Sequence, residues 1–416
     1  MTAERGGFAA LDSCVHCGFC LQACPTFLAT GDEADGPRGR IELMRGLERG
    51  TLTADDPTVT THLDRCLGCR GCEPVCPSGV GYGHGLEAAR ERLAAARGVP
   101  PLVRATLALL TTAGPARVIY ALARTLRATG IPALFAGWGR MRFAMGMLGA
   151  TAPEVGGSWS RSVEVGGGGS TNILHPPPPT SQTSPVLLFR GCVMDGLFSH
   201  VHDATIRTLA VNGYATEEVP AQVCCGALHA HAGLADSARA LARANIAAFG
   251  EGDTPIVVNS AGCGAQLKGY ADKAFAARVR DVTELLAAAG PVAGAAIGGR
   301  VAYDPPCHLL HAQRIAEPPL RVLAAVPGLE VLTLPDAAQC CGGAGMYTLV
   351  EPALSRAVLA PKLEALRAAA PDAVATGNPG CVMQIGAGLR AARLSYPVVH
   401  PVELLDASYR RAGLYA

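Results

Sequence analysis

Two evenly spaced cysteine runs near the N-terminus constrain this chain more than any other feature. Each run reads Cys-x2-Cys-x2-Cys-x3-Cys-Pro, closed by Pro25 in the first and by Pro77 in the second. This is the spacing with which thiolates hold a pair of 4Fe-4S clusters. Three close thiolates bind one cluster, and the fourth, set apart before the proline, reaches the other. The spacing therefore predicts one cluster on Cys14, Cys17, Cys20 and Cys76, and another on Cys66, Cys69, Cys72 and Cys24.

Two zinc sites are the alternative interpretation of these runs, because Cys-x2-Cys is also a zinc spacing. A zinc site, however, needs only four ligands, and it has no use for a regularly placed third cysteine or for the proline that follows the fourth. The runs favour iron-sulfur clusters.

The overall composition of the chain limits the classes of protein to which it can belong. It has 416 residues, of which 49% are hydrophobic, so it can form several domains with cores of their own. A net charge of +1 and the lack of an aromatic and basic stripe argue against a nucleic-acid partner. All sixteen cysteines fall in cluster-like motifs, and the first residues lack a secretory pattern. These features predict a reducing, cytoplasmic location.

The chain divides by composition. Residues 1–91 form a helical two-cluster module, with 41 residues between its cysteine runs. Residues 92–154 form a helical connector. Its stretch from 92 to 152 carries eight arginines and no acidic residue, and no part of it is long and apolar enough to span a bilayer. Residues 155–184 are rich in glycine and then in proline, which predicts a linker.

The rest of the chain repeats itself, which predicts two similar lobes over residues 185–298 and 299–416. Each lobe has an apolar run that ends in a cysteine, then a Cys-Cys-Gly triplet, then a second apolar run that ends in a cysteine. If the runs are strands followed by helices, the thiolates gather at strand carboxyl ends beside helix N-termini. The candidate metal ligands are Cys192, Cys224, Cys225 and Cys263 in the first lobe, and Cys307, Cys340, Cys341 and Cys381 in the second. The predicted fold class is thus α+β and multidomain, with two tandem α/β lobes.

These motifs resemble a known family. The two lobes are similar to the cysteine-rich CCG domains of heterodisulfide reductases and of related subunits that oxidise glycerol-3-phosphate, lactate or glycolate. The segments CVHCGFC at 14–20, GPRGRI at 36–41 and LDRCLGCRGCEPVCPSGV at 63–80 resemble the iron-sulfur subunits of glycolate oxidase. The substrate and the partner subunits follow only from this resemblance.

One departure from the heterodisulfide reductase pattern bears on the chemistry. In that pattern each lobe ends in Cys-x2-Cys and supplies five thiolates, whereas here glutamine stands three positions after Cys263 and after Cys381. Four thiolates per lobe suit an ordinary cluster, a zinc ion or a redox-active thiol site. His308, next to Cys307, is a possible fifth ligand or proton relay, although an ordinary hydrogen-bonding role is the more common use of such a residue.

The resemblance implies an electron relay. The sequence contains no dinucleotide fingerprint and no nucleotide-binding loop, and clusters cannot take a hydride from a hydroxy acid. An FAD-bearing partner subunit must therefore oxidise glycolate or a related 2-hydroxy acid, and this chain passes the electrons toward a quinone-like acceptor.

Three alternatives to this interpretation stay open. The chain could serve a lactate or glycerol-3-phosphate complex, it could reduce a disulfide at its lobes, or it could be a zinc-bearing scaffold. The acid-free stretch of the connector suggests, in addition, peripheral contact with the inner face of the membrane, although packing against the lobes or a partner explains it equally well.

Overall fold

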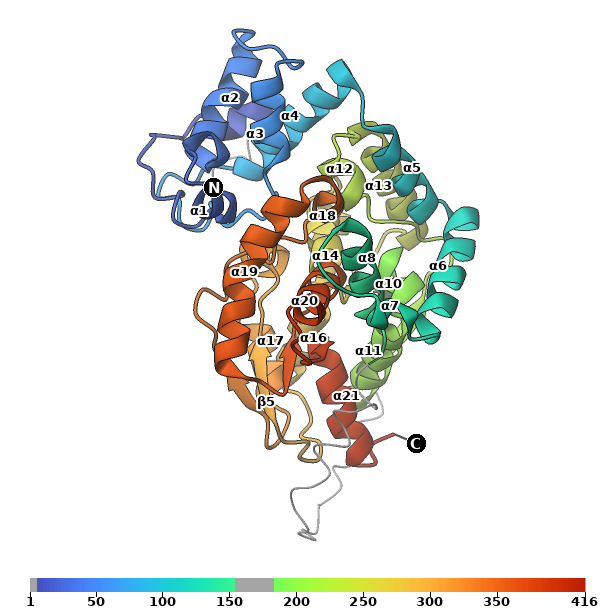
Figure 1. Ribbon diagram of the computed structural model, residues 1–416. Helices are drawn as coiled ribbons and strands as arrows, with labels where there is room; N and C mark the ends of the chain where they lie inside the picture. The colour runs from blue at the N-terminus through green and yellow to red at the C-terminus, as the bar shows by residue number, and fades with distance from the viewer. Residues whose placement is uncertain (1–5, 154–182, 416) are drawn as a thin grey trace.

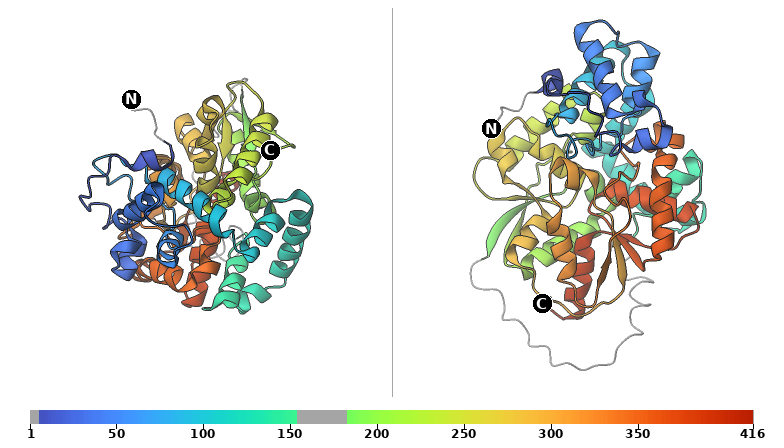
Figure 2. Two further views of the ribbon diagram at one scale, coloured as in Figure 1. Left: turned by 90° about the horizontal axis from the view of Figure 1, so that it is seen from above. Right: turned by 90° about the vertical axis from the view of Figure 1, so that its left-hand side faces the viewer.

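The computed structural model describes residues 6–153 and 183–415. The predicted linker at 155–184 lies outside the described residues up to position 182. The N-terminal module sits at one end of the molecule above the two lobes, and the connector helices run down one side (Figures 1 and 2). The multidomain α/β class predicted from the sequence is confirmed.

The module is helical, and its helices begin and end where local chemistry predicts. Pro37 opens α2, and Gly50, in the left-handed conformation at φ 72°, closes it. Asp56 caps α3 by accepting hydrogen bonds from two backbone N–H groups of the first turn. The elements are η1 (Gly7–Leu11), α1 (Pro25–Thr30), η2 (Glu33–Asp35), α2 (Pro37–Arg49), α3 (Pro57–Asp64) and α4 (Tyr82–Arg97).

The connector consists of four helices that wrap the lobes. They are α5 (Pro101–Thr111), α6 (Ala113–Ala128), α7 (Ile131–Leu134) and α8 (Arg140–Gly149). Helix α6 packs on the first lobe and α8 on the second. Among the described residues no single helix could cross a bilayer. Only together do helices α4 and α5 have the length and apolar composition of a membrane-spanning segment, and the two helices meet at a bend of 116°.

The first lobe is a four-stranded parallel sheet in the order β2-β1-β3-β4. Leu187 on the inner strand β1 pairs with Glu217 on one side and with Ile256 on the other. The elements are β1 (Ser184–Phe189), α10 (Val193–Leu197), α11 (Ser199–Val211), β2 (Tyr214–Glu218), α12 (Ala227–His231), α13 (Ala235–Phe249), β3 (Ile256–Val258), α14 (Ala261–Lys268), α15 (Lys273–Arg278), β4 (Val279–Asp281) and α16 (Val282–Ala289).

The second lobe repeats this order as β6-β5-β7-β8, again with parallel pairs. Its elements are β5 (Arg300–Tyr303), the π-helical turn η3 (His308–Ala312), α17 (Glu317–Ala324), β6 (Glu330–Leu332), α18 (Tyr347–Val350), α19 (Pro352–Ala369), β7 (Ala373–Ala375), α20 (Pro379–Ala391), β8 (Val398–Val399) and α21 (Pro401–Arg411). One hydrophobic core, with Leu188 from β1 and Val374 from β7, joins the two lobes.

Candidate metal centres

The cysteines of the module form two groups, each drawn from both runs. Cys14, Cys17 and Cys76 surround Cys20, and burial raises the pKa of the Cys20 thiol to about 11. Cys66, Cys69 and Cys24 surround Cys72, where burial also raises the pKa of the thiol well above its usual value. In both groups the fourth cysteine comes from the opposite run, which is the grouping that crossed ligation requires. A metal centre bound here would replace the thiol protons, because metals bind cysteine as thiolate.

A buried arginine supports the second group. The Arg40 side chain is 1% exposed, and its Nη1 lies 3.9 Å from Cys24 Sγ and 2.9 Å from Thr26 Oγ1. Burial opposes the ionisation of Cys66, but the guanidinium groups of Arg40 and Arg90 lower the pKa of that thiol. Tyr82 donates a hydrogen bond to Cys66 Sγ at 3.5 Å. Positive charge and donated hydrogen bonds favour thiolate at this site.

The lobe cysteines meet at strand carboxyl ends, as the repeat predicted. In the first lobe Cys192 follows β1 and caps α10, and Cys263 lies in the first turn of α14 after β3. Strands β1 and β3 are neighbours whose crossovers leave in opposite directions, which is where α/β sheets form their binding crevice. Cys192 Sγ lies 3.5 Å from Cys224 Sγ, and Cys225 Sγ lies 3.4 Å from Cys263 Sγ.

The second lobe repeats this arrangement. Cys307 caps η3 after β5, and Cys381 lies in the first turn of α20 after β7. Cys307 Sγ lies 3.9 Å from Cys340 Sγ. Asn378 links the two sites, because its Oδ1 accepts from the N–H of Gly262 and its Nδ2 donates to Cys381 Sγ at 3.5 Å.

The protein ionises only some of these thiols by itself. Hydrogen bonds from Cys192 and Cys225 lower the pKa of the Cys224 thiol, and the same hydrogen bonds, together with burial, raise the pKa of the two donors. In the second lobe, a hydrogen bond with Cys341 and burial raise the pKa of Cys381. A hydrogen bond with Cys307 and burial raise the pKa of Cys340. Four converging sulfur atoms with some protons still in place suit a thiophilic metal centre, either iron-sulfur or zinc.

The histidines near these sites have different partners. His308 Nδ1 lies 3.5 Å from Cys307 Sγ, and the centroid of its ring lies 5.4 Å from that of His231 of the first lobe, with the two rings tilted by 31°. His311 instead contacts the Ala338 carbonyl at 2.9 Å. His229 hydrogen-bonds with Cys224, a contact that the sequence did not predict because the second lobe has no histidine at the matching place.

The module docks on the second lobe through its cluster-binding segment. Cys69 packs against the buried group that contains Cys340 and influences the pKa of the Cys340 thiol, so a thiol from each domain meets at the junction. Leu67 packs with Cys340 and Tyr347 in one buried group, and Tyr347 donates a hydrogen bond to the Arg65 carbonyl at 2.9 Å. The first-lobe site has no such contact with the module among the described residues. Instead Tyr120 of α6 lies near Cys192 and Cys224, which help raise the pKa of its hydroxyl.

Comparisons with known proteins agree with this architecture. The family model described as a 4Fe-4S dicluster domain matches residues 10–80, and the cysteine-rich domain model named CCG matches residues 186–268 and 301–386. The probable glycolate oxidase iron-sulfur subunit of Bacillus subtilis is 32% identical, over 97% of this chain and 95% of that protein. The chain belongs to the glycolate oxidase iron-sulfur subunit family.

Two further relatives differ in how much of this chain they match. The glycolate oxidase iron-sulfur subunit of Escherichia coli is also 32% identical, over 95% of this chain and 93% of that protein. Lactate utilization protein A of Geobacillus kaustophilus is 31% identical over 53% of this chain and 98% of that protein. The family resemblance predicted from the cysteine motifs is confirmed, and the dicluster domain implies two 4Fe-4S clusters.

Proposed function

We propose that this chain relays single electrons from an FAD-bearing partner subunit, which oxidises glycolate or a related 2-hydroxy acid, toward a quinone-like acceptor. The contact between Cys69 and Cys340 is the observation that carries the proposal. It brings the cluster-binding segment of the module against the cysteine site of the second lobe. The choice of glycolate rests on what the relatives of Bacillus subtilis and Escherichia coli are called.

In this proposal the eight module cysteines are the cluster ligands in the crossed assignment, and the eight lobe cysteines hold further iron-sulfur or zinc centres. Clusters bound there supply one-electron steps between the flavin and the acceptor. The protein positions and shields them. Arg40 and Arg90 offset thiolate charge at Cys66, and Leu67 and Tyr347 exclude water from the junction with the second lobe.

Serine variants of the module test the relay. In Cys17→Ser and Cys69→Ser complexes we expect the hydroxy acid to bleach the flavin as in the wild type, while reduction of the acceptor falls, because the flavin site lies on another subunit. Flavin absorbance and acceptor absorbance, followed in the same sample, separate the two steps. Unchanged acceptor reduction in both variants would rule out the relay.

The connector supports a second part of the proposal, that the chain rests on an anionic membrane surface. Eight of its large apolar side chains are exposed: Leu102, Leu109, Val118, Leu122, Ile131, Leu134, Phe135 and Met141. Exposed arginines accompany them, among them Arg104, Arg117, Arg140 and Arg142. Apolar side chains among arginines without acidic neighbours fit the boundary between lipid headgroups and acyl chains.

Two other connector arginines hold α6 in place, so they are not needed to explain membrane contact. Arg124 donates to the Gly196 carbonyl at 2.8 Å, and Arg127 donates to the carbonyls of Thr151 and Leu197. These residues attach α6 to the first lobe. The packing alternative that the sequence left open thus accounts for part of the arginine pattern, and the exposed remainder supports membrane contact.

Flotation with vesicles tests the membrane contact. We expect the protein to float with anionic vesicles and less with neutral ones, and Leu122→Glu to reduce flotation because it places a charge in the apolar surface. Leu28→Glu, at an exposed leucine of the module, is the matched control and should float as the wild type does. Absence of flotation with both kinds of vesicle counts against the contact.

A further inference from the structure

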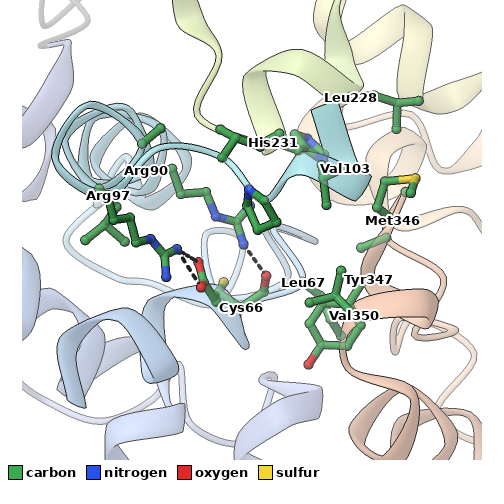
Figure 3. Close-up of a pocket in the computed structure, with 18 of the residues that line it drawn as sticks. Cys66, Leu67, Arg90, Arg97, Val103, Leu228, His231, Met346, Tyr347 and Val350 are labelled. Atoms are coloured by element: carbon green, nitrogen blue, oxygen red, sulfur yellow. Dashed lines mark hydrogen bonds and ion pairs between the residues drawn. The ribbon is translucent and has the colours of Figure 1, made fainter. Parts of the chain in front are cut away.

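A cavity of about 140 Å³ lies where the module, the connector and both lobes meet (Figure 3). Leu67 comes from the module, Val103 from α5, Leu228 from α12 of the first lobe, and Met346 from the second lobe, next to α18. An engineered protein cavity of about 150 Å³ binds benzene, so this one has room for a single six-membered ring. No single domain forms it, so it exists only in the assembled chain.

The lining selects for an uncharged ligand. Most of the wall is hydrocarbon, with Leu93, Val99 and Val350 beside the four residues above. The arginines at one side are already engaged. Arg97 pairs with Asp64 at 2.6 Å, and Arg90 donates to the carbonyls of Leu63 and Cys66. A charged substrate would have to break these contacts, whereas a planar ring with carbonyl oxygens would not.

The cavity lies beside the cysteine-bearing segments of the junction. One wall includes Cys66 and Leu67 of the second cysteine run. The facing wall includes Ala344 and Tyr347, and Tyr347 packs in the same buried group as Cys340 (Figure 3). A ring held here would lie against the segments that we propose bind the centres on either side, in position to receive electrons.

Exposed apolar side chains adjoin the cavity. Val350, which lines it, is 47% exposed, and Leu102, which precedes the lining residue Val103 on α5, is 72% exposed. A hydrocarbon tail on the ring could leave along α5. An uncharged ring with a hydrocarbon tail is the chemical structure of a membrane quinone.

We infer that this cavity binds the head group of a quinone, an inference that rests on the proposed relay. The quinone takes two electrons, one at a time, and two protons from water, and becomes a hydroquinone. The two electrons come from the 2-hydroxy acid, which is oxidised to the 2-oxo acid on the FAD-bearing partner subunit.

Binding of the single-ring probe 2,3,5,6-tetramethyl-1,4-benzoquinone to the full-length holoprotein, measured by calorimetry, tests the inference. This probe lacks the free ring position that thiols attack. We expect it to bind the wild type and to bind Val103→Trp and Leu228→Phe at least about tenfold more weakly, because both substitutions fill the cavity. Val118→Trp, at an exposed position of the same connector, should bind as the wild type does. Equal binding by all variants, or no binding by the wild type, overturns the inference.

A water-soluble one-electron dye separates this test from the test of the relay. In the whole complex the cavity variants should reduce ferricyanide at the wild-type rate while reduction of the tetramethyl-benzoquinone falls. If ferricyanide reduction survives and quinone binding is absent, the cavity assignment fails alone. If the wild-type complex reduces neither, the relay itself fails.

Discussion

The two lobes share a strand order and a cysteine pattern, yet their cysteine sites have different neighbours. The first-lobe site is covered by the connector, where Tyr120 lies near Cys192 and packs on Gly196. The second-lobe site is covered by the module through Cys69 and Leu67. The two lobes thus have the same fold but different neighbours. Among the described residues, only the second-lobe site brings a lobe cysteine into contact with a module cysteine.

The ion pairs of the lobes differ in the same way. Three residues before Cys307, Asp304 pairs with Lys362, and both side chains are buried. In the first lobe Arg190, two residues before Cys192, pairs with Glu218 and Asp195 at the surface. The second lobe therefore holds a charged pair in its interior beside its thiols, and the first lobe does not.

The largest expected difference concerns electron transfer. Cys340 and Cys224 are each the first cysteine of a Cys-Cys-Gly triplet, so their serine variants are a matched pair. We expect Cys340→Ser to lower hydroxy-acid-dependent acceptor reduction nearly to background, at least about 100-fold, or about 2.7 kcal/mol. Cys224→Ser should retain most of the rate. An equal loss in both variants would mean that the lobes act in series.

The buried ion pair gives the largest expected effect on stability. Lys362→Met leaves Asp304 buried without its partner, which we expect to lower the free energy of unfolding by about 3–5 kcal/mol. Arg190→Met removes a surface pair worth about 0–1 kcal/mol. Denaturant titration of the holoproteins measures both changes. Similar losses would contradict the difference in burial.

Matched helix caps should respond to acid with opposite signs. Asp281 caps α16 and His400 caps α21, each in a capping box. Burial raises the pKa of Asp281 to about 6 and lowers the pKa of His400 to about 3. Below pH 6.5 the unfolded histidine gains a proton that the folded one does not, so His400 costs stability as the pH falls. Folded Asp281 gains its proton near pH 6, before unfolded aspartate does, so it adds stability.

Asparagine variants separate these two contributions, because asparagine also caps helices. Between pH 6.5 and 5 we expect His400→Asn to lose up to about 2 kcal/mol less stability than the wild type. Asp281→Asn should lose more than the wild type over the same range. Urea titrations at several pH values measure both slopes, and parallel slopes for the two variants would contradict the assignment.

The smallest expected effect comes from two tyrosine hydroxyls. Tyr347 donates to the Arg65 carbonyl at the module junction, and Tyr120 donates to the Leu110 carbonyl in the connector. Each phenylalanine variant should cost about 1 kcal/mol of stability. Only Tyr347→Phe should also slow acceptor reduction, because only it loosens the contact between module and second lobe. Slower acceptor reduction in Tyr120→Phe, with an unchanged rate in Tyr347→Phe, would contradict this assignment.

The cysteine pattern predicted the lobes because it is local. A strand followed by a cysteine and a helix places the thiol at the strand end whatever surrounds it, and Cys192 and Cys307 lie there. The repeat of the spacing then gave two lobes of one topology. The family followed from the same residues.

The surroundings of the sites could not be predicted, because they depend on contacts between distant segments. Tyr347 and Arg65 are 282 positions apart, and no local pattern pairs them. Arg40 could have been a surface residue, but docking of the module segments buries it beside Cys24. The connector arginines divide into bound and exposed groups only once α6 is packed on the first lobe.

The position of the electrons after mixing tests the central claim most directly. Complexes carrying Cys340→Ser or Cys224→Ser are mixed with hydroxy acid and acceptor, frozen within milliseconds to seconds, and examined by electron paramagnetic resonance. The account predicts that reduced module clusters accumulate in Cys340→Ser and are reoxidised in Cys224→Ser. Module clusters that are reoxidised at the same rate in both variants would show that electrons do not leave through the second lobe.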